Sequence, residues 1–108
     1  MGRFVIVAYR PKPGRAEDLK ALVARHVDVL RQEGLATDHP ASVMQAADGA
    51  IVEVFEWVSA DAIARAHSNP VVGAMWGEFF ELCDFFPLNT LPETGQLFAE
   101  FESLAEEG

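Results

Sequence analysis

Residues 42–58 read SVMQAADGAIVEVFEWV, and this stretch does most to decide the fold. Two strand-like runs, Ser42–Ala47 and Ala50–Val58, flank the dipeptide Asp48-Gly49. Asp-Gly between such runs is a strong hairpin signal, because a type I′ turn needs positive φ at both central residues. The second run is apolar on both faces, which is typical of a central strand. We therefore predict an antiparallel hairpin that supplies a central strand of a sheet.

The segments on either side of this hairpin alternate between strand-like and helix-like patterns. Strand-like runs are rich in β-branched and aromatic residues, whereas helical runs repeat their apolar positions every three or four residues. Proline, glycine and capping residues mark the boundaries between them. The predicted elements are a strand at Arg3–Arg10 (RFVIVAYR), a helix at Arg15–Glu33, the hairpin, a short helix from Ser59 to His67, a helix from Val71 to Asp84, and a closing strand around Leu97, Phe98 and Phe101.

The order of these elements, β-α-β-β-α-β, is that of the ferredoxin-like fold. This α+β fold has an antiparallel sheet with both helices on one face, and 108 residues suit one domain, 1–108. The first and third strands would be central, and both are apolar on both faces. Because helices cover only one face, the other needs an apolar partner. A second copy of the same sheet is the simplest partner, so we expect a homodimer.

Composition and charge argue against several kinds of partner. The formal net charge is −9, and seven of the eight Lys and Arg residues lie at or before Arg31. Without a basic patch in the acidic remainder, we do not expect DNA, RNA or anionic membranes as partners. The apolar run Phe4–Ala8 is too short for a signal peptide, and no stretch approaches the length of a membrane span. We therefore expect a cytoplasmic protein.

The stretch Glu53–Val71, EVFEWVSADAIARAHSNPV, carries a family resemblance. It resembles the antibiotic-biosynthesis-monooxygenase-like proteins of the dimeric α/β-barrel superfamily. Members typically show a strand ending in Glu-x-Trp-x-Ser, a short helix ending in Ala-His, and a turn that contains proline. The corresponding residues here are Glu56 (one residue before Trp57), Trp57, Ser59, Ala66, His67 and Pro70.

This resemblance implies a two-subunit barrel with a pocket between sheet and helices in each subunit. Some members oxygenate polycyclic aromatic substrates without metal or flavin, some degrade haem, some act on quinols, and many have no known role. The haem degraders pair a histidine at the position of His67 with an asparagine in the first strand. The first strand here offers Ala8 and Tyr9 but no asparagine, so haem degradation is the less favoured activity.

His26 is the first candidate for a catalytic residue. Its helical phase places it inside the apolar stripe of the first helix, so it should face the sheet rather than water. A buried imidazole needs a hydrogen-bond partner and suits a general base or a substrate contact. The alternative is a core histidine bonded to a backbone carbonyl, and the sequence leaves both open. The stripe consists of Leu19, Leu22, Val23, Val27 and Leu30.

His67 is the second catalytic candidate, because it ends the short helix at the position that the resemblance singles out. The alternative is a histidine that interacts with the helix dipole and the exposed carbonyls. Trp57, Trp76 and Phe80 are predicted to form the walls of a substrate pocket. An aromatic stripe at helical spacing is also typical of a core, and Trp76 would then need a partner for its N–H group.

Two carboxylates on the third strand, Glu53 and Glu56, must point to opposite faces of the sheet. One of them could pair with His26 or His67, and Glu56 is our candidate substrate contact. The alternative places each near a strand end, in water or against an arginine. A carboxylate on an otherwise apolar central strand needs either a partner or a raised pKa.

No sequence motif for a metal or an organic cofactor is present. The chain lacks a phosphate loop, a nucleotide fingerprint, a GxSxG elbow and a metal-spaced His/Cys cluster. The single cysteine, Cys83, excludes an internal disulfide and is predicted to be a small buried apolar residue. We therefore expect neither a metal nor a cofactor.

Three functions remain open from the sequence. The first is a cofactor-independent monooxygenase for a small aromatic or quinol-type molecule, with His26 or His67 as the base. The second is a module that binds a small molecule in the same pocket without catalysis. The third is a structural dimeric barrel. Since the fold hosts several activities, the residues of the site must decide between them.

Overall fold

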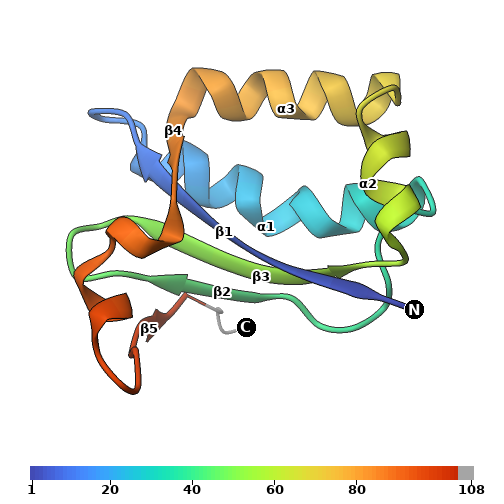
Figure 1. The fold of residues 1–108 in the computed structure, drawn as a ribbon. Coiled ribbons are helices and arrows are strands. Elements are labelled where there is room, and N and C mark those ends of the chain that lie inside the picture. Colours follow the sequence, from blue (N-terminus) through green and yellow to red (C-terminus); the bar gives the residue numbers. More distant parts are fainter. Residues whose placement is uncertain (105–108) are drawn as a thin grey trace.

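The computed structural model describes residues 1–104 and confirms an α+β, ferredoxin-like architecture (Figure 1). An antiparallel sheet in the order β4-β1-β3-β2-β5 forms one layer, and the longer helices form the other. The elements are β1 (Arg3–Pro11), α1 (Ala16–Gln32), β2 (Ser42–Gln45), β3 (Ile51–Trp57), α2 (Ala60–Ala66), α3 (Pro70–Leu82), β4 (Cys83–Phe86), the 3₁₀ turns η1 (Leu88–Thr90) and η2 (Pro92–Gly95), and β5 (Glu102–Ser103).

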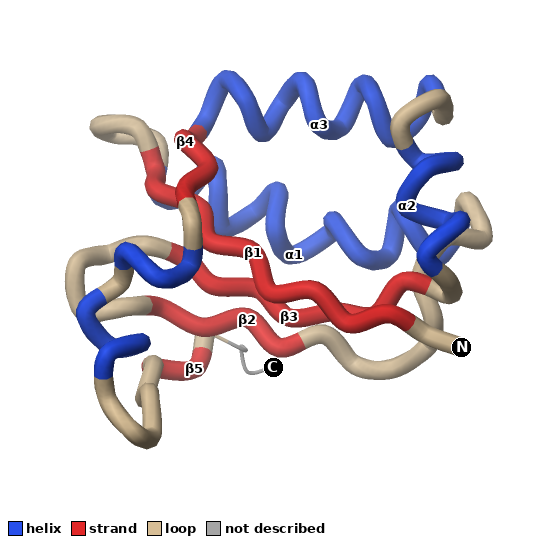
Figure 2. Tube along the Cα trace, in the orientation of Figure 1, coloured by secondary structure: helices blue, strands red, loops and turns tan. Residues whose placement is uncertain are grey.

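The two central strands are β1 and β3, as predicted. They pair along their full common length, from Arg3 opposite Trp57 to Tyr9 opposite Ile51. Helices α1 and α3 lie over one face of the sheet and pack beside each other (Figure 2). Since side chains alternate between faces along a strand, Tyr9, Phe55 and Trp57 enter the main core under these helices.

The helices begin within one residue of the predicted positions, and α1 and α2 also end within one residue of theirs. The Ser59 hydroxyl accepts a hydrogen bond from the Ala62 N–H and caps α2, and the Asn69 side chain caps α3. In α1 the apolar stripe is buried, and His26 is buried within it. Among residues 1–104, no helix combines the length and apolar character that crossing a bilayer requires.

The hairpin turn differs from the predicted type I′ geometry. A type I′ turn requires positive φ at both Asp48 and Gly49, but within residues 1–104 only glycines have positive φ. Gly49 adopts φ +95°, and its N–H donates to the Ala46 carbonyl at 3.0 Å. The Asp48 side chain accepts from the Ala50 N–H instead. This local hydrogen bond keeps Asp48 out of the left-handed region and lengthens the loop by one residue.

The closing strand of the sheet also differs from the prediction. We predicted it around Leu97, Phe98 and Phe101, but the strand beside β1 is β4, which follows α3 without a loop (Figure 2). Cys83 leaves the helix with extended backbone angles, so the helix ends two residues before the predicted Asp84. Leu97 and Phe98 lie in an irregular exposed segment, and only the short β5 pairs with β2.

Cys83 lies at this junction and is buried, as predicted. Its Sγ–H donates to the Phe79 carbonyl at 3.2 Å. Burial, with a smaller effect from Asp84, raises the pKa of the Cys83 thiol to about 11. The thiol therefore stays protonated near neutral pH and behaves as a packing group rather than a nucleophile.

The sheet face opposite the helices is only partly covered. At one end, the turns η1 and η2 and the segment after them pack Leu91 and Phe101 against Ala8 and Val52. At the other end, the apolar side chains of Phe4 and Ile6 are each 52% exposed. The apolar pattern on both faces of β1 is thus present in the structure, and on this face Phe4 and Ile6 are exposed within residues 1–104.

Candidate functional site

A cavity of about 140 Å³ lies between the sheet and helices α1 and α3. On this side of the sheet β4 pairs only with Ala8–Pro11 and ends before Pro87, so within residues 1–104 the first part of β1 has a strand, β3, along one edge only. Phe85, which is 46% exposed, and the half-buried Trp76 mark its open side. The walls are almost entirely aromatic and aliphatic. They consist of Val5, Val7, Tyr9, His26, Phe55, Trp57, Trp76, Phe79 and Phe85.

A buried hydrogen-bond network lies behind one wall of this cavity. Glu53 on β3 is fully buried, and its Oε1 accepts from the Tyr9 hydroxyl at 2.7 Å. The same oxygen lies 2.8 Å from Nδ1 of His26. Three elements therefore converge on one carboxylate oxygen: β1 through Tyr9, α1 through His26, and β3 through Glu53.

This network fixes the orientation and the chemistry of the imidazole. Because a carboxylate oxygen only accepts hydrogen bonds, the proton of neutral His26 lies on Nδ1. Nε2 then carries a lone pair and makes no hydrogen bond to residues 1–104. An imidazole held through Nδ1 by a carboxylate, with Nε2 free, has the arrangement that general-base catalysis uses.

Tyr9 serves this network as a hydrogen-bond donor. Burial, reinforced by the Glu53 carboxylate, raises the pKa of Tyr9 well above its ordinary value. The phenol therefore stays protonated and keeps donating to Glu53. Oε2 of Glu53 is the one fully buried side-chain nitrogen or oxygen atom within residues 1–104 that has no partner. Oε1 therefore accepts both of the side-chain hydrogen bonds that the Glu53 carboxylate makes.

Aromatic contacts hold the imidazole from the sides. The ring of His26 meets Phe55 edge-on at a centroid distance of 5.2 Å and Phe79 at 5.0 Å. Phe79 in turn stacks on Tyr9 at 5.0 Å. Such pairs stabilise a fixed geometry by about 1 kcal/mol each beyond the area they bury. His26 therefore has little freedom to rotate away from the cavity.

The structure brings three of the six predicted site residues to this cavity. His26 lies at its base, and Trp57 and Trp76 form parts of its wall. Of the two open interpretations of His26, the backbone-bonded core histidine does not hold, because its partner is the Glu53 carboxylate.

The other three predicted site residues lie outside the cavity lining. His67 is exposed at the end of α2, where its ring packs against Trp76 at 5.1 Å. Glu56 lies on the opposite face of the sheet and accepts from the Thr37 hydroxyl at 2.9 Å, because strand side chains alternate. Phe80, one position past Phe79 on α3, turns outward, is 63% exposed and stacks on Phe85.

Sequence reasoning missed Tyr9 and could not choose Glu53 over Glu56. Tyr9 has the same strand phase as Val5 and Val7, so its face was readable, but its distance to Glu53 depends on the register between β1 and β3. That register places Glu53 opposite Val7, two pairs along the ladder from Tyr9 and on the same face. The one available signal was that a carboxylate interrupts the apolar run Ile51–Phe55, because a buried carboxylate is unfavourable without a partner.

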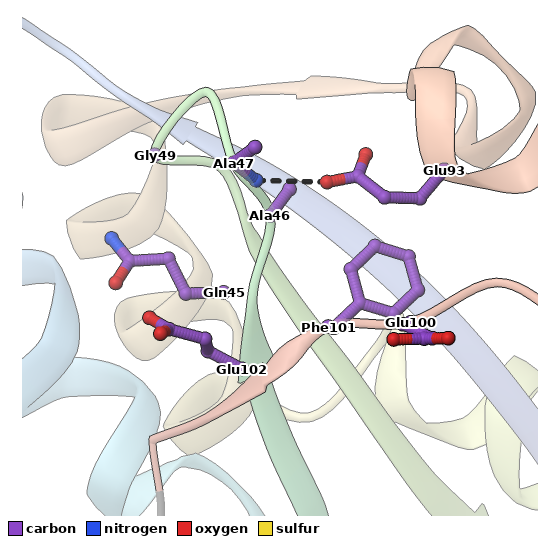
Figure 3. Close-up of a pocket in the computed structure, with 8 residues that line it drawn as sticks. All are labelled: Gln45, Ala46, Ala47, Gly49, Glu93, Glu100, Phe101 and Glu102. Carbon is purple, nitrogen blue, oxygen red and sulfur yellow. Dashed lines mark hydrogen bonds between the residues drawn. The ribbon is translucent and has the colours of Figure 1, made fainter.

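A second, larger hollow of about 480 Å³ lies at the hairpin turn beside the C-terminal segment. Glu93 reaches across it from η2 and accepts from the Ala47 N–H at 2.8 Å (Figure 3). Glu100 and Glu102 on its other wall are exposed. It holds no histidine or nucleophile, and its carboxylates are solvated, so it offers less chemistry than the cavity beside His26. Within residues 1–104, no group of three or more His, Cys, Asp or Glu side chains is placed to hold a metal ion.

Comparison with solved structures supports the fold. The structure of Rv0793 from Mycobacterium tuberculosis matches with a TM-score of 0.62, over 81% of this chain and 87% of that chain. The two sequences are 22% identical over this match. No protein-family model and no curated protein matches the sequence.

Proposed function

We propose that this protein binds a small aromatic or quinol-type molecule in the cavity beside His26 and oxygenates it without a cofactor. One observation carries the proposal: Nδ1 of His26 is bonded to a fully buried carboxylate while its ring forms part of an aromatic cavity wall. The resemblance of Glu53–Val71 to the antibiotic-biosynthesis-monooxygenase-like proteins supports the same assignment. Membership in that family is part of the proposal.

The proposed reaction needs only a base and molecular oxygen. His26 Nε2 removes the hydroxyl proton of an electron-rich phenol, and the electron pair delocalises to the ring carbon opposite the oxygen. That carbon bonds to one atom of O₂, the O–O bond breaks, and the second oxygen leaves as water. The substrate loses two hydrogens and gains one oxygen to become a quinone, so it supplies all four electrons that O₂ accepts. The protein supplies position, a proton acceptor and a dry site.

Oxygen consumption by purified protein tests this proposal. We expect uptake with electron-rich phenols or quinols, and incorporation of one atom of labelled O₂ into each phenol that is converted to a quinone. His26→Gln removes the base and should lower the rate about 100-fold or more. The matched control is His39→Gln, an exposed loop histidine, which should keep the full rate. Ligand binding without oxygen uptake would instead favour a non-catalytic binding module.

We further propose that the chain works as a single domain within a homodimer. The support is the exposed sheet end at Phe4 and Ile6, which lies on the face that no helix covers. Apolar side chains at such a position are stabilised when a second apolar surface removes them from water. A second copy presents an identical patch, so an isologous contact covers both at once.

Replacement of Ile6 by lysine should dissociate this dimer. Burying an uncompensated charge costs several kcal/mol, so we expect the dissociation constant to rise about 100-fold or more. Sedimentation velocity over a range of concentrations measures the change. Val71→Lys is the matched control, because Val71 is a β-branched residue of similar exposure, 48%, on the helical side. If both variants sediment like the wild type, the sheet face is not the interface.

A further inference from the structure

We infer that the cavity beside His26 takes a phenol with one aromatic ring and one ionisable hydroxyl, bound as the phenolate. This inference rests on the proposed function, because it assumes that the cavity binds a ligand. It narrows the class from aromatic and quinol-type molecules to monohydric, single-ring phenols. The reasons are the size of the cavity, the count of hydrogen-bond acceptors in its wall, and the charge behind His26.

The size of the cavity limits the ligand to one ring. An apolar cavity of roughly 150 Å³ admits one benzene ring. The cavity here, at about 140 Å³, is of that size. Phe79 and Phe55, which are 1% and 3% exposed, form part of its walls and are packed into the core. A second fused ring would have to displace one of these core side chains. Substituents that point toward Phe85 meet the open side and are tolerated.

The wall offers one free basic hydrogen-bond acceptor. The hydroxyl of Tyr9 and Nδ1 of His26 are both engaged by Glu53. The indole N–H groups of Trp57 and Trp76 make no hydrogen bond to residues 1–104, but they can only donate. Nε2 of His26 is therefore the one ring nitrogen in the wall with a free lone pair, and the only other side-chain acceptor is the Tyr9 hydroxyl oxygen, which is fixed by its own bond to Glu53. A second hydroxyl inside the cavity would have only this neutral and already oriented oxygen to donate to, so we expect it to weaken binding by roughly tenfold or more.

The charge behind His26 favours transfer of the proton. When the ligand O–H bond breaks, its proton forms a bond to Nε2 and the electron pair stays on the ligand oxygen. The imidazolium that results lies between two negative oxygens, the phenolate in front and the Glu53 carboxylate at 2.8 Å behind. A charge so flanked in an apolar site is stabilised strongly. Glu53 thus acts as a positioning residue, and Tyr9 holds Glu53 in place.

Titration with 4-nitrophenol tests this inference directly. Its phenolate has a separate visible absorption band, and its electron-poor ring does not react with O₂, so the signal reports binding and ionisation alone. At a pH below the pKa of the free phenol, we expect the phenolate band to grow with added protein. We expect 4-nitrocatechol and 4-nitro-1-naphthol, which add a hydroxyl and a fused ring, to bind about tenfold or more weakly. His26→Gln should abolish the band, whereas His39→Gln should not.

The isostere 4-nitrotoluene separates this inference from the proposed function. It has the same shape but no ionisable proton, and tryptophan fluorescence quenching reports its binding. If 4-nitrotoluene binds and 4-nitrophenol binds only as the neutral phenol, the ligand site stands and the phenolate inference is overturned. If the naphthol or the catechol binds as tightly as 4-nitrophenol, the size or acceptor limit is overturned. If neither 4-nitrophenol nor 4-nitrotoluene binds, both this inference and the proposed function are overturned.

Discussion

Glu53→Ala is expected to lower the free energy of unfolding by about 3–5 kcal/mol. Glu53 is fully buried, and Oε1 is the acceptor for both Tyr9 and His26. Its removal leaves two buried donors without a partner, at about 1–3 kcal/mol each, and leaves a cavity that the sheet cannot close. Single domains have only about 5–15 kcal/mol of stability, so the variant should be close to unfolding. Urea denaturation followed by tryptophan fluorescence measures the loss.

Glu56→Ala is the matched control for this prediction. It removes the same side chain three positions along the same strand, but on the opposite face. There Glu56 is half-buried and accepts from the Thr37 hydroxyl. We expect a loss of about 1 kcal/mol. Equal losses at the two positions would mean that the network around Glu53 contributes nothing beyond an ordinary strand carboxylate.

Glu53→Gln separates stability from positioning. The amide keeps the volume, and its oxygen can still accept from Tyr9 and His26, but its NH₂ group replaces Oε2, which has no partner, so we expect the variant to recover part of the stability that Glu53→Ala loses. It removes the negative charge behind His26, so bound 4-nitrophenol should shift from phenolate toward the neutral phenol. A purely structural role for Glu53 would leave that ratio unchanged once the variant is folded.

The sequence predicts most of what the helices contribute to this site. The 3.6-residue period of α1 placed His26 among its buried apolar neighbours, and the structure finds it 4% exposed. Alternation along β3 placed Glu53 and Glu56 on opposite faces. Both inferences use only the periodicity of one element, which the backbone geometry of that element enforces.

The features of the site that the sequence does not predict depend on contacts between elements. The choice of Glu53 as the partner of His26 needs the height of α1 above β3, and the role of Tyr9 needs the register of β1 against β3. The strand β4 was missed because three of its four residues, Cys83, Phe85 and Phe86, continue the apolar composition of α3. A short apolar run is compatible with helix or strand, and here pairing with β1 decides it.

Phe79 connects the stability of this core to the size of the ligand. Its side chain is 1% exposed and is the shared neighbour of Tyr9, His26 and Phe85, at centroid distances of 5.0, 5.0 and 6.2 Å. Phe79→Ala should cost about 3–5 kcal/mol of unfolding free energy, because burial and packing are lost together. Phe80→Ala, the neighbouring and 63% exposed ring, should stay within about 1 kcal/mol of the wild type.

The space that Phe79→Ala opens should be continuous with the cavity, because Phe79 is one of its walls. We therefore expect the variant to accept the fused ring of 4-nitro-1-naphthol, which the wild type should bind only weakly. Because a ligand that binds only the folded state stabilises it, a given concentration of naphthol should raise the melting temperature of Phe79→Ala by more than that of the wild type. A destabilised variant that gains no affinity for the naphthol would show that Phe79 supports the core but does not set the size of the site. In that case, the Phe79 side chain would not be what limits the ligand to one aromatic ring.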